Sequence, residues 1–160
     1  MVKKYMNCVG DLIFSPDVQN LEHYAQHGDI SRLRHSLNVS YYSFLICRIF
    51  GLHYRDAARA GLLHDLFFYY WQDLSPENTK SHVLLHPRIA LENARVITKL
   101  NRREEEIIAL HMFPLCGRFP RFLETYIVSL VDKICAFMEA LTFIKRIPRL
   151  CRVKIASRNR

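Results

Sequence analysis

The chain of 160 residues consists largely of helix-length segments, separated by residues that are typical of helix ends. Serine followed by proline favours a helix start, while glycine and proline favour a stop. The alternation of apolar and polar residues that is typical of a strand is nowhere sustained. We therefore predict an all-α bundle of about six helices. The predicted helices span residues 15–28, 31–51, 54–73, 86–100, 101–113 and 121–146.

Several boundaries of these helices are specific predictions. Ser31 is expected to cap the second helix and Gly51 to end it. Residues 74–82 are polar and are expected to form a loop. Pro114 and Pro148 are expected to end the fifth and sixth helices, because proline cannot continue a helix.

The composition is that of a compact helical protein with one domain. Half of the residues are hydrophobic and only five are glycine, and a chain of this length can bury a full core. No repeat, low-complexity tract or linker divides it. We expect an N-terminal segment at residues 1–16, a helical domain at 17–144 and a basic tail at 145–160.

The formal charge of +8 is concentrated at one end of the chain. Residues 145–160 hold seven of the 23 Lys and Arg residues and no acid, so the rest of the chain is close to neutral. A solvated end is the favoured interpretation of this tail. Contact with nucleic acid is expected only through it, if at all.

Other features concern the compartment. No charge-free apolar run approaches the ~18 residues that a transmembrane helix needs, so no membrane insertion is expected. The start of the chain lacks the pattern of a secretory signal. The five cysteines are scattered, with no Cys-x-x-Cys pair, which argues against a disulfide framework or a zinc–thiolate site. We expect a cytoplasmic protein with reduced cysteines.

Residues 61–71, GLLHDLFFYYW, place a base and an acid in the middle of an apolar stretch that resembles a helix interior. Burying the carboxylate of Asp65 costs several kcal/mol unless a neighbouring group neutralises it. The fold must therefore supply a partner for the pair His64 and Asp65.

Candidate partners occur at regular intervals along the chain. The intervals are 29 residues from His35 to His64, 21 from Asp65 to His86, 25 from His86 to His111 and 21 from His111 to Asp132. Each interval is about one helix plus one connection, and each residue shares a helix face with apolar neighbours. Successive antiparallel helices can therefore bring all six side chains to one level, where a metal ion would neutralise the carboxylates and bind the imidazoles.

A structural alternative exists for each of these residues taken singly. A lone histidine on an apolar face is more often a hydrogen-bonded core residue than a metal ligand. Asp132 can make a local polar contact with Lys133 or Arg121. Six such residues at compatible levels favour the metal site.

The ordered set resembles the HD superfamily of metal-dependent phosphohydrolases, named for its adjacent His-Asp pair. RHSLNVS matches the first histidine of the family at His35, GLLHDL matches the pair at His64 and Asp65, and VSLVDKICA matches the late aspartate at Asp132. The resemblance covers residues 17–143. It implies an HD-like helical domain and a hydrolytic enzyme.

Two further segments resemble the binuclear members of the superfamily. LLHPRIALENA matches a fourth histidine at His86, although His82 is an alternative, and IIALHMFP matches a fifth at His111. The resemblance implies one metal bound by His35, His64, Asp65 and Asp132, and another bound by His86, His111 and Asp65. The Gly-Lys after the pair and the GYP segment of the cyclic-dinucleotide phosphodiesterases are missing, which argues against that substrate.

The implied chemistry is hydrolysis of a phosphoester or phosphoanhydride, of a nucleotide or another small phosphorylated metabolite, by a metal-activated hydroxide. Asp65 and His64 are the expected catalytic residues. Imidazole and carboxylate ligands suit one or two divalent ions, Fe or Mn first, with Mg, Co, Ni or Zn as alternatives. Some HD proteins with this ligand set resemble mixed-valence di-iron oxygenases, and a non-catalytic metal- or nucleotide-binding module is a third possibility.

A phosphate ester also needs groups that bind its charge. The candidates near the ligands in sequence are His27, Arg34, His82, Arg118 and Lys133. Each is individually more often a surface or structural residue. The aromatic run at residues 67–71 is expected to pack in the core, although one ring could line a base pocket.

Overall fold

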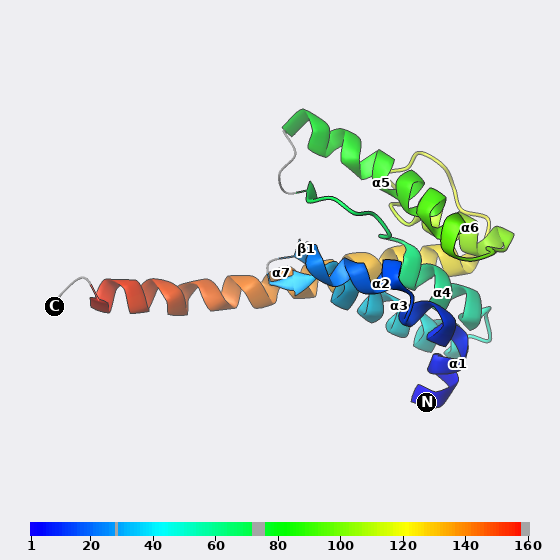
Figure 1. Cartoon of the computed structure of the whole chain (residues 1–160), viewed down its shortest axis with the longest axis horizontal. Coiled ribbons are helices and arrows are strands. Elements are labelled where there is room, and N and C mark those ends of the chain that lie inside the picture. Colours follow the sequence, from blue (N-terminus) through cyan, green and yellow to red (C-terminus); the bar gives the residue numbers. More distant parts are fainter. Residues whose placement is uncertain (28, 72–75, 158–160) are drawn as a thin grey trace.

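Figure 1 shows the fold, which is a computed structural model. It describes the backbone of residues 1–27, 29–71 and 76–157, and in these ranges the side chains of all but residues 27, 76–81 and 142–157. The all-α class is confirmed, because the described residues form seven α-helices and only two very short strands. In chain order the elements are α1 (Val2–Ile13), α2 (Pro16–Asn20), the 3-10 helix η1 (Leu21–His23), β1 (Ala25–His27), β2 (Ile30–Ser31), α3 (Arg32–Ile49), α4 (Tyr54–Leu63), α5 (Pro76–Ile97), α6 (Arg102–Leu110) and α7 (Leu123–Ser157).

Several of the predicted helix ends are present. The Ser31 side chain accepts a hydrogen bond from the backbone N–H of Arg34, which caps α3 as predicted. Gly51 follows the end of α3 with a φ of 67°, in the left-handed region that glycine adopts at little cost. At the start of α6, Asn101 and Glu104 form a reciprocal capping box. These local contacts explain why α3 and α6 match their predicted ranges closely.

The single helix predicted over residues 15–28 is wrong. Ser15 does cap a helix, but α2 ends at Asn20, and the chain passes through η1 into the strand β1. The antiparallel pairing of β1 with β2 replaces the expected helical hydrogen bonds, and the backbone N–H of Arg32 closes the turn by donating to the carbonyl of Tyr24 at 2.7 Å.

The helix predicted over residues 54–73 ends at Leu63, so His64 and Asp65 lie in a turn and not in a helix interior. The buried guanidinium of Arg32 donates to the carbonyl of Phe67 at 2.6 Å and to that of Tyr69 at 3.1 Å. This distant side chain therefore holds residues 66–69 in a non-helical course that local sequence does not reveal.

Three other boundaries differ from the predictions. The helix α5 begins at Pro76, so the loop expected over residues 74–82 is wrong from that residue on. The helix α7 continues through Pro148 to Ser157, so Pro148 does not end it. Residues 2–13, where no helix was predicted, form α1, which buries Tyr5, Cys8, Val9 and Leu12 along one face.

The helix α4 lies at the centre of the bundle. It packs against α3 most extensively and also contacts α1, α6 and α7. The crossing with α3 is close at Gly61, where a Cβ atom would lie 3.1 Å from the Cα of Ser40. The missing side chain of Gly61 therefore lets α3 and α4 approach closely, and a Cβ atom there would require the α3 backbone to shift by a few tenths of an ångström.

Figure 1 shows α5 and α6 on one side of α4, with α3 on the other, while α7 runs along the bundle and extends past the remaining helices. Among the described helices, none has the length and apolar character that crossing a bilayer requires.

Candidate metal centre

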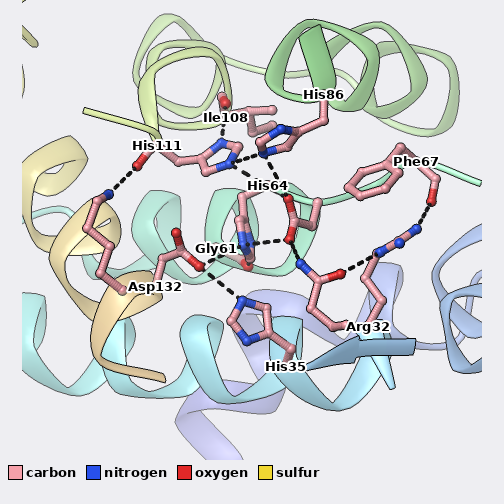
Figure 2. Close-up of polar contacts among 12 residues, drawn as sticks. Arg32, His35, Gly61, His64, Phe67, His86, Ile108, His111 and Asp132 are labelled. Atoms are coloured by element: carbon pink, nitrogen blue, oxygen red, sulfur yellow. Dashed lines mark hydrogen bonds and ion pairs between the residues drawn. The ribbon is translucent and has the colours of Figure 1, made fainter. Parts of the chain in front are cut away.

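Six predicted side chains come together in the interior of the bundle, as Figure 2 shows for most of them. They come from different elements: His35 from α3, His64 and Asp65 from the turn after α4, His86 from α5, His111 from the end of α6 and Asp132 from α7. All six are buried, and Asp132 is the most exposed of them at 9%. The structure therefore brings together all of the residues that the sequence analysis named as ligands.

Three of the histidines are held by carbonyls of their own helices. Nδ1 of His64 lies 2.9 Å from the carbonyl oxygen of Gly61, and Nδ1 of His111 lies 2.8 Å from that of Ile108. Nδ1 of His86 lies 2.8 Å from the carbonyl oxygen of His82. A carbonyl only accepts, so each Nδ1 carries the proton, and in the neutral ring each Nε2 is left with a lone pair.

These lone pairs face one another. Nε2 of His86 and Nε2 of His111 lie 2.8 Å apart, although each is an acceptor in the neutral ring. Nε2 of His64 is buried and has no hydrogen-bond partner among the described residues. Buried polar atoms are nearly always paired, so this arrangement of buried acceptors fits a cation bound among the imidazoles.

The support of His35 is different. Its Nε2 lies 3.0 Å from Oδ1 of Asp132, and its Nδ1 lies 2.8 Å from Oε2 of Glu139, a second carboxylate of α7. Asn38 donates to the other carboxylate oxygen of Glu139 at 3.1 Å. Glu139 therefore fixes the orientation of the His35 ring, with Nε2 directed to the centre.

Asp65 lies between the two groups of histidines. Its Oδ1 is 3.4 Å from Nε2 of His86 and 3.7 Å from Nε2 of His111, and its Oδ2 is 3.4 Å from Nε2 of His64. The Gln26 side chain donates to Oδ2 at 2.5 Å. With one oxygen directed to each side, Asp65 has the position of a bridging carboxylate.

The pKa values follow from this crowding. Burial alone would lower the pKa of His35, but hydrogen bonds to Asp132 and Glu139 outweigh burial and raise it to about 10. Burial, together with the neighbouring His86 and His64, lowers the pKa of His111 to about 3. Burial alone would raise the pKa of Asp65, but the surrounding histidines hold it below its usual range.

The potential ligand atoms form two sets, and within each set they all lie within 4.8 Å of one another. One set comes from His35, His64 and Asp132, and the other comes from His64, Asp65 and His111. All of the donors are imidazole nitrogens or carboxylate oxygens, which suit divalent transition metals. The orphaned Nε2 of His64 and the facing nitrogens of His86 and His111 are the atoms that such ions would satisfy. The residues present therefore fit a metal centre.

A cavity of about 250 Å³ borders this centre. Asp65, His86, His111 and Asp132 form part of its wall, and most of the remaining wall is apolar. The other lining residues are Gln26, Phe67, Trp71, His82, Val83, Met112, Lys133 and Ala136. A small molecule in this cavity would meet the carboxylates and imidazoles directly.

Of the predicted substrate-binding residues, two line this cavity. His82 does so with its Nδ1 2.8 Å from the hydroxyl of Tyr69, and its ring stacks on Trp71. The structure places His86, and not His82, against His111 and Asp65. Lys133 donates to Ser129 and to the carbonyl of His111, and Asp132 contacts histidines instead of the suggested Lys133 or Arg121.

The remaining substrate-binding predictions fall elsewhere. Arg34 is exposed on α3 and Arg118 is exposed in the loop before α7, and neither lines the cavity. The side chain of His27 lies outside the described part of the chain.

Three residues that support the centre were missed by the sequence analysis. Glu139 follows Asp132 by seven residues, which places both on one face of α7, and this spacing could have indicated it. Arg32 lies three residues before His35 on α3, and its Nε donates to Gln26 at 2.8 Å. No sequence signal identifies Gln26, because it reaches Asp65 from a strand that was predicted as helix.

Comparison with known proteins gives one match. The family model described as HD domain matches residues 32–137, most of the chain and all six candidate ligands. No curated protein and no solved structure matches. The match lies within the predicted domain at residues 17–144, whose boundaries stay a prediction.

Proposed function

Since this chain belongs to the HD domain family, whose members are mostly metal-dependent hydrolases, we propose that it is a phosphohydrolase. The proposed substrate is a nucleotide or another small phosphorylated metabolite, cleaved at a phosphoester or phosphoanhydride bond. The carrying observation is the convergence of four imidazoles and two carboxylates in a cluster that borders a cavity, with Asp65, His86, His111 and Asp132 in the cavity wall. Six ligands from five segments of a bundle serve no packing purpose that leucine would not serve better.

Each ligand has a proposed place. His35, His64, Asp65 and Asp132 hold one ion, and His86, His111 and Asp65 hold the other. When bound, a pair of ions lowers the pKa of coordinated water to about 7 and neutralises charge on a phosphoryl group. The ligand types favour iron or manganese.

The catalytic work of the chain itself falls on its carboxylates and imidazoles. Asp65, with Oδ2 held by Gln26, orients the attacking water from the position between the two groups of histidines. His64, whose Nδ1 proton is fixed by the Gly61 carbonyl, keeps its Nε2 available as a ligand. The burial of this cluster excludes bulk water and so strengthens its electrostatic effect.

The proposed substrate site is the adjoining cavity. Among the described residues that line the cavity, Lys133 is the only Lys or Arg. It supplies a positive charge for a phosphate oxygen. Trp71, which is partly exposed, offers an aromatic ring to the organic part of the substrate, whereas Phe67 is fully buried in the cavity wall. A base ring stacked on an aromatic side chain contributes about 1–3 kcal/mol in nucleic-acid complexes.

The deciding experiment uses the full chain, purified without oxygen and loaded with Fe²⁺ or Mn²⁺. Phosphate release is measured over nucleotides, dinucleoside polyphosphates and simple phosphoesters, with and without oxygen. We expect release that is independent of oxygen and is lost on chelation. His86→Gln should lower it at least about 100-fold, in line with the effect of about 2.7 kcal/mol that removing an active-site group has, whereas the exposed His23→Gln should leave it unchanged.

Two outcomes would contradict the proposal. Turnover that requires oxygen would indicate an oxygenase. A metal-loaded chain without turnover, which binds RNA with steep salt dependence, would indicate a binding module with a basic tail.

A further inference from the structure

The helix α7 carries apolar residues at alternating spacings of four and three along the face opposite the metal centre. Asp132 and Glu139 lie seven residues apart on the inner face, where both contact His35. The outer face carries a row that we call the α7 stripe, which consists of Leu123, Ile127, Leu130, Ile134, Phe137 and Leu141. This alternation is the a/d repeat by which one helix packs along another.

The α7 stripe is largely uncovered. Its exposed side chains are Leu123 at 62%, Leu130 at 60%, Ile134 at 52% and Phe137 at 64%, and the adjacent Met138 is also exposed. A helix that is apolar on two opposite faces is typically buried on both. The bundle covers one face of α7, whereas no element of the described chain covers the other face.

The stripe continues into an apolar groove. Between α3 and α7 lies a hollow of about 510 Å³, whose wall includes Tyr42, Ile46, Ile134 and Met138. Phe137 is the most exposed member of the stripe, and Ile134, another member, forms part of the groove wall. A two-fold contact pairs the same surface patch of two copies, so the exposed apolar side chains of one copy can pack against the apolar stripe and groove of the other.

We propose that the α7 stripe binds the α7 stripe of a second copy of this chain, so that the protein is a two-fold symmetric dimer. A symmetric copy meets no like charge there, because every stripe residue is apolar. Burying five half-exposed side chains of roughly 100 Å² each removes roughly 500 Å² from water, and the groove wall adds the further area that brings the contact toward the ~800 Å² per partner of a standard interface. The repeat itself specifies a helix as the occupant, and a dimer supplies one.

The proposal is independent of the proposed function and is tested by mass. Light scattering after gel filtration of the full chain at micromolar concentrations should give twice the chain mass of 18.9 kDa. Ile134→Glu should give the monomer mass, because two carboxylates would be buried against apolar side chains. Leu130→Glu is a second variant with the same expectation.

The matched control is Val96→Glu. Val96 is 85% exposed on α5, away from the α7 stripe, so the same change there should leave the dimer intact. Circular dichroism checks that each variant keeps its helix content. A wild-type chain that stays monomeric over the concentration range would overturn the proposal, and this is also the result expected if a different protein covers the stripe. An Ile134→Glu variant that still forms a dimer would overturn it as well.

Discussion

The His35 side of the metal centre and the His86–His111 side hold their imidazoles by different means. On the His35 side, two carboxylates of α7 flank the ring, at 3.0 Å for Asp132 and 2.8 Å for Glu139. On the other side, backbone carbonyls hold the rings, and the two Nε2 atoms meet at 2.8 Å. Carboxylates therefore contact both nitrogens of the His35 ring, whereas on the other side backbone carbonyls contact Nδ1 and Asp65 is the nearby carboxylate, at 3.4 Å from His86 and 3.7 Å from His111.

This difference decides which imidazole is charged before a metal binds. The raised pKa of His35, about 10, keeps its ring protonated at neutral pH, whereas the lowered pKa of His111, about 3, keeps that ring neutral. A metal on the His35 side must displace a proton, but it gains a ligand made more basic by a carboxylate. A metal on the other side finds a free lone pair.

The two sides also differ in how their geometry arises. The carbonyls that hold His86 and His111 lie four and three residues earlier in the chain, so these rings are oriented as soon as their helices form. Glu139 lies 104 residues from His35 and reaches it only when α7 packs on α3. The orientation of His35 is thus a consequence of tertiary structure.

The largest expected effect comes from Asp65, which lies between the two sides and is the proposed bridge. Asp65→Asn should remove the negative charge between them and abolish stoichiometric metal binding on both sides. Turnover should fall by at least about 1,000-fold, equivalent to about 4 kcal/mol. Metal analysis and phosphate release measure this, with the exposed Asp17→Asn as control. Retention of both metals would show that Asp65 is not shared.

Glu139→Gln should separate the two sides. It preserves the shape of the side chain but removes the charge behind His35, and loss of such a supporting group typically costs 10–100-fold in metal affinity. We expect this loss on the His35 side alone, measured by titration against a competing chelator. The exposed Glu92→Gln is the control, and an equal loss on both sides would remove the asymmetry.

The pH dependence of metal binding should differ in the same way. His35 has a pKa raised from 6.5 to about 10, so its charged form stabilises the metal-free protein fully below pH 6.5 and progressively less as the pH rises through 10. Metal affinity on the His35 side should therefore increase with pH between these values, by up to tenfold per pH unit for one displaced proton. Calorimetry in buffers of different ionisation enthalpy measures the released proton.

The same measurement on His35→Gln provides the comparison. The lowered pKa of His111 leaves no proton to displace above pH 5 or so. Proton release that persists unchanged in His35→Gln would assign it to another group, such as His64, whose pKa is also raised.

The smallest effect is expected at Lys133, whose Nζ joins the two sides by donating to the carbonyl of His111 from the position next to Asp132. Lys133→Gln should raise KM about tenfold, or about 1.4 kcal/mol, because it removes one charge from the cavity wall. Metal content should stay the same, which separates this residue from the ligands. The exposed Lys99→Gln is the control, and a loss of metal would make Lys133 a structural residue.

The features that the sequence revealed are those with a local or periodic cause. The cap at Ser31 and the stop at Gly51 located α3, and the regular intervals between His35, His64 and Asp132 predicted their convergence. The short course of α4 was not predictable, because Arg32 ends it through carbonyls 35 and 37 residues away. The role of Gln26 was not predictable for the same reason, since Gln26 reaches Asp65 only once the β1–β2 pair is folded.

Gly61 has two structural roles, one in helix packing and one in the orientation of a metal ligand. Its missing side chain lets α4 lie against the backbone of Ser40, and its carbonyl oxygen holds the proton of His64. An alanine there would force the α3 backbone to shift by a few tenths of an ångström, carrying His35 away from His64. A methyl group remote from any reacting atom would then widen the coordination sphere, so Gly61→Ala should weaken metal binding without changing any ligand.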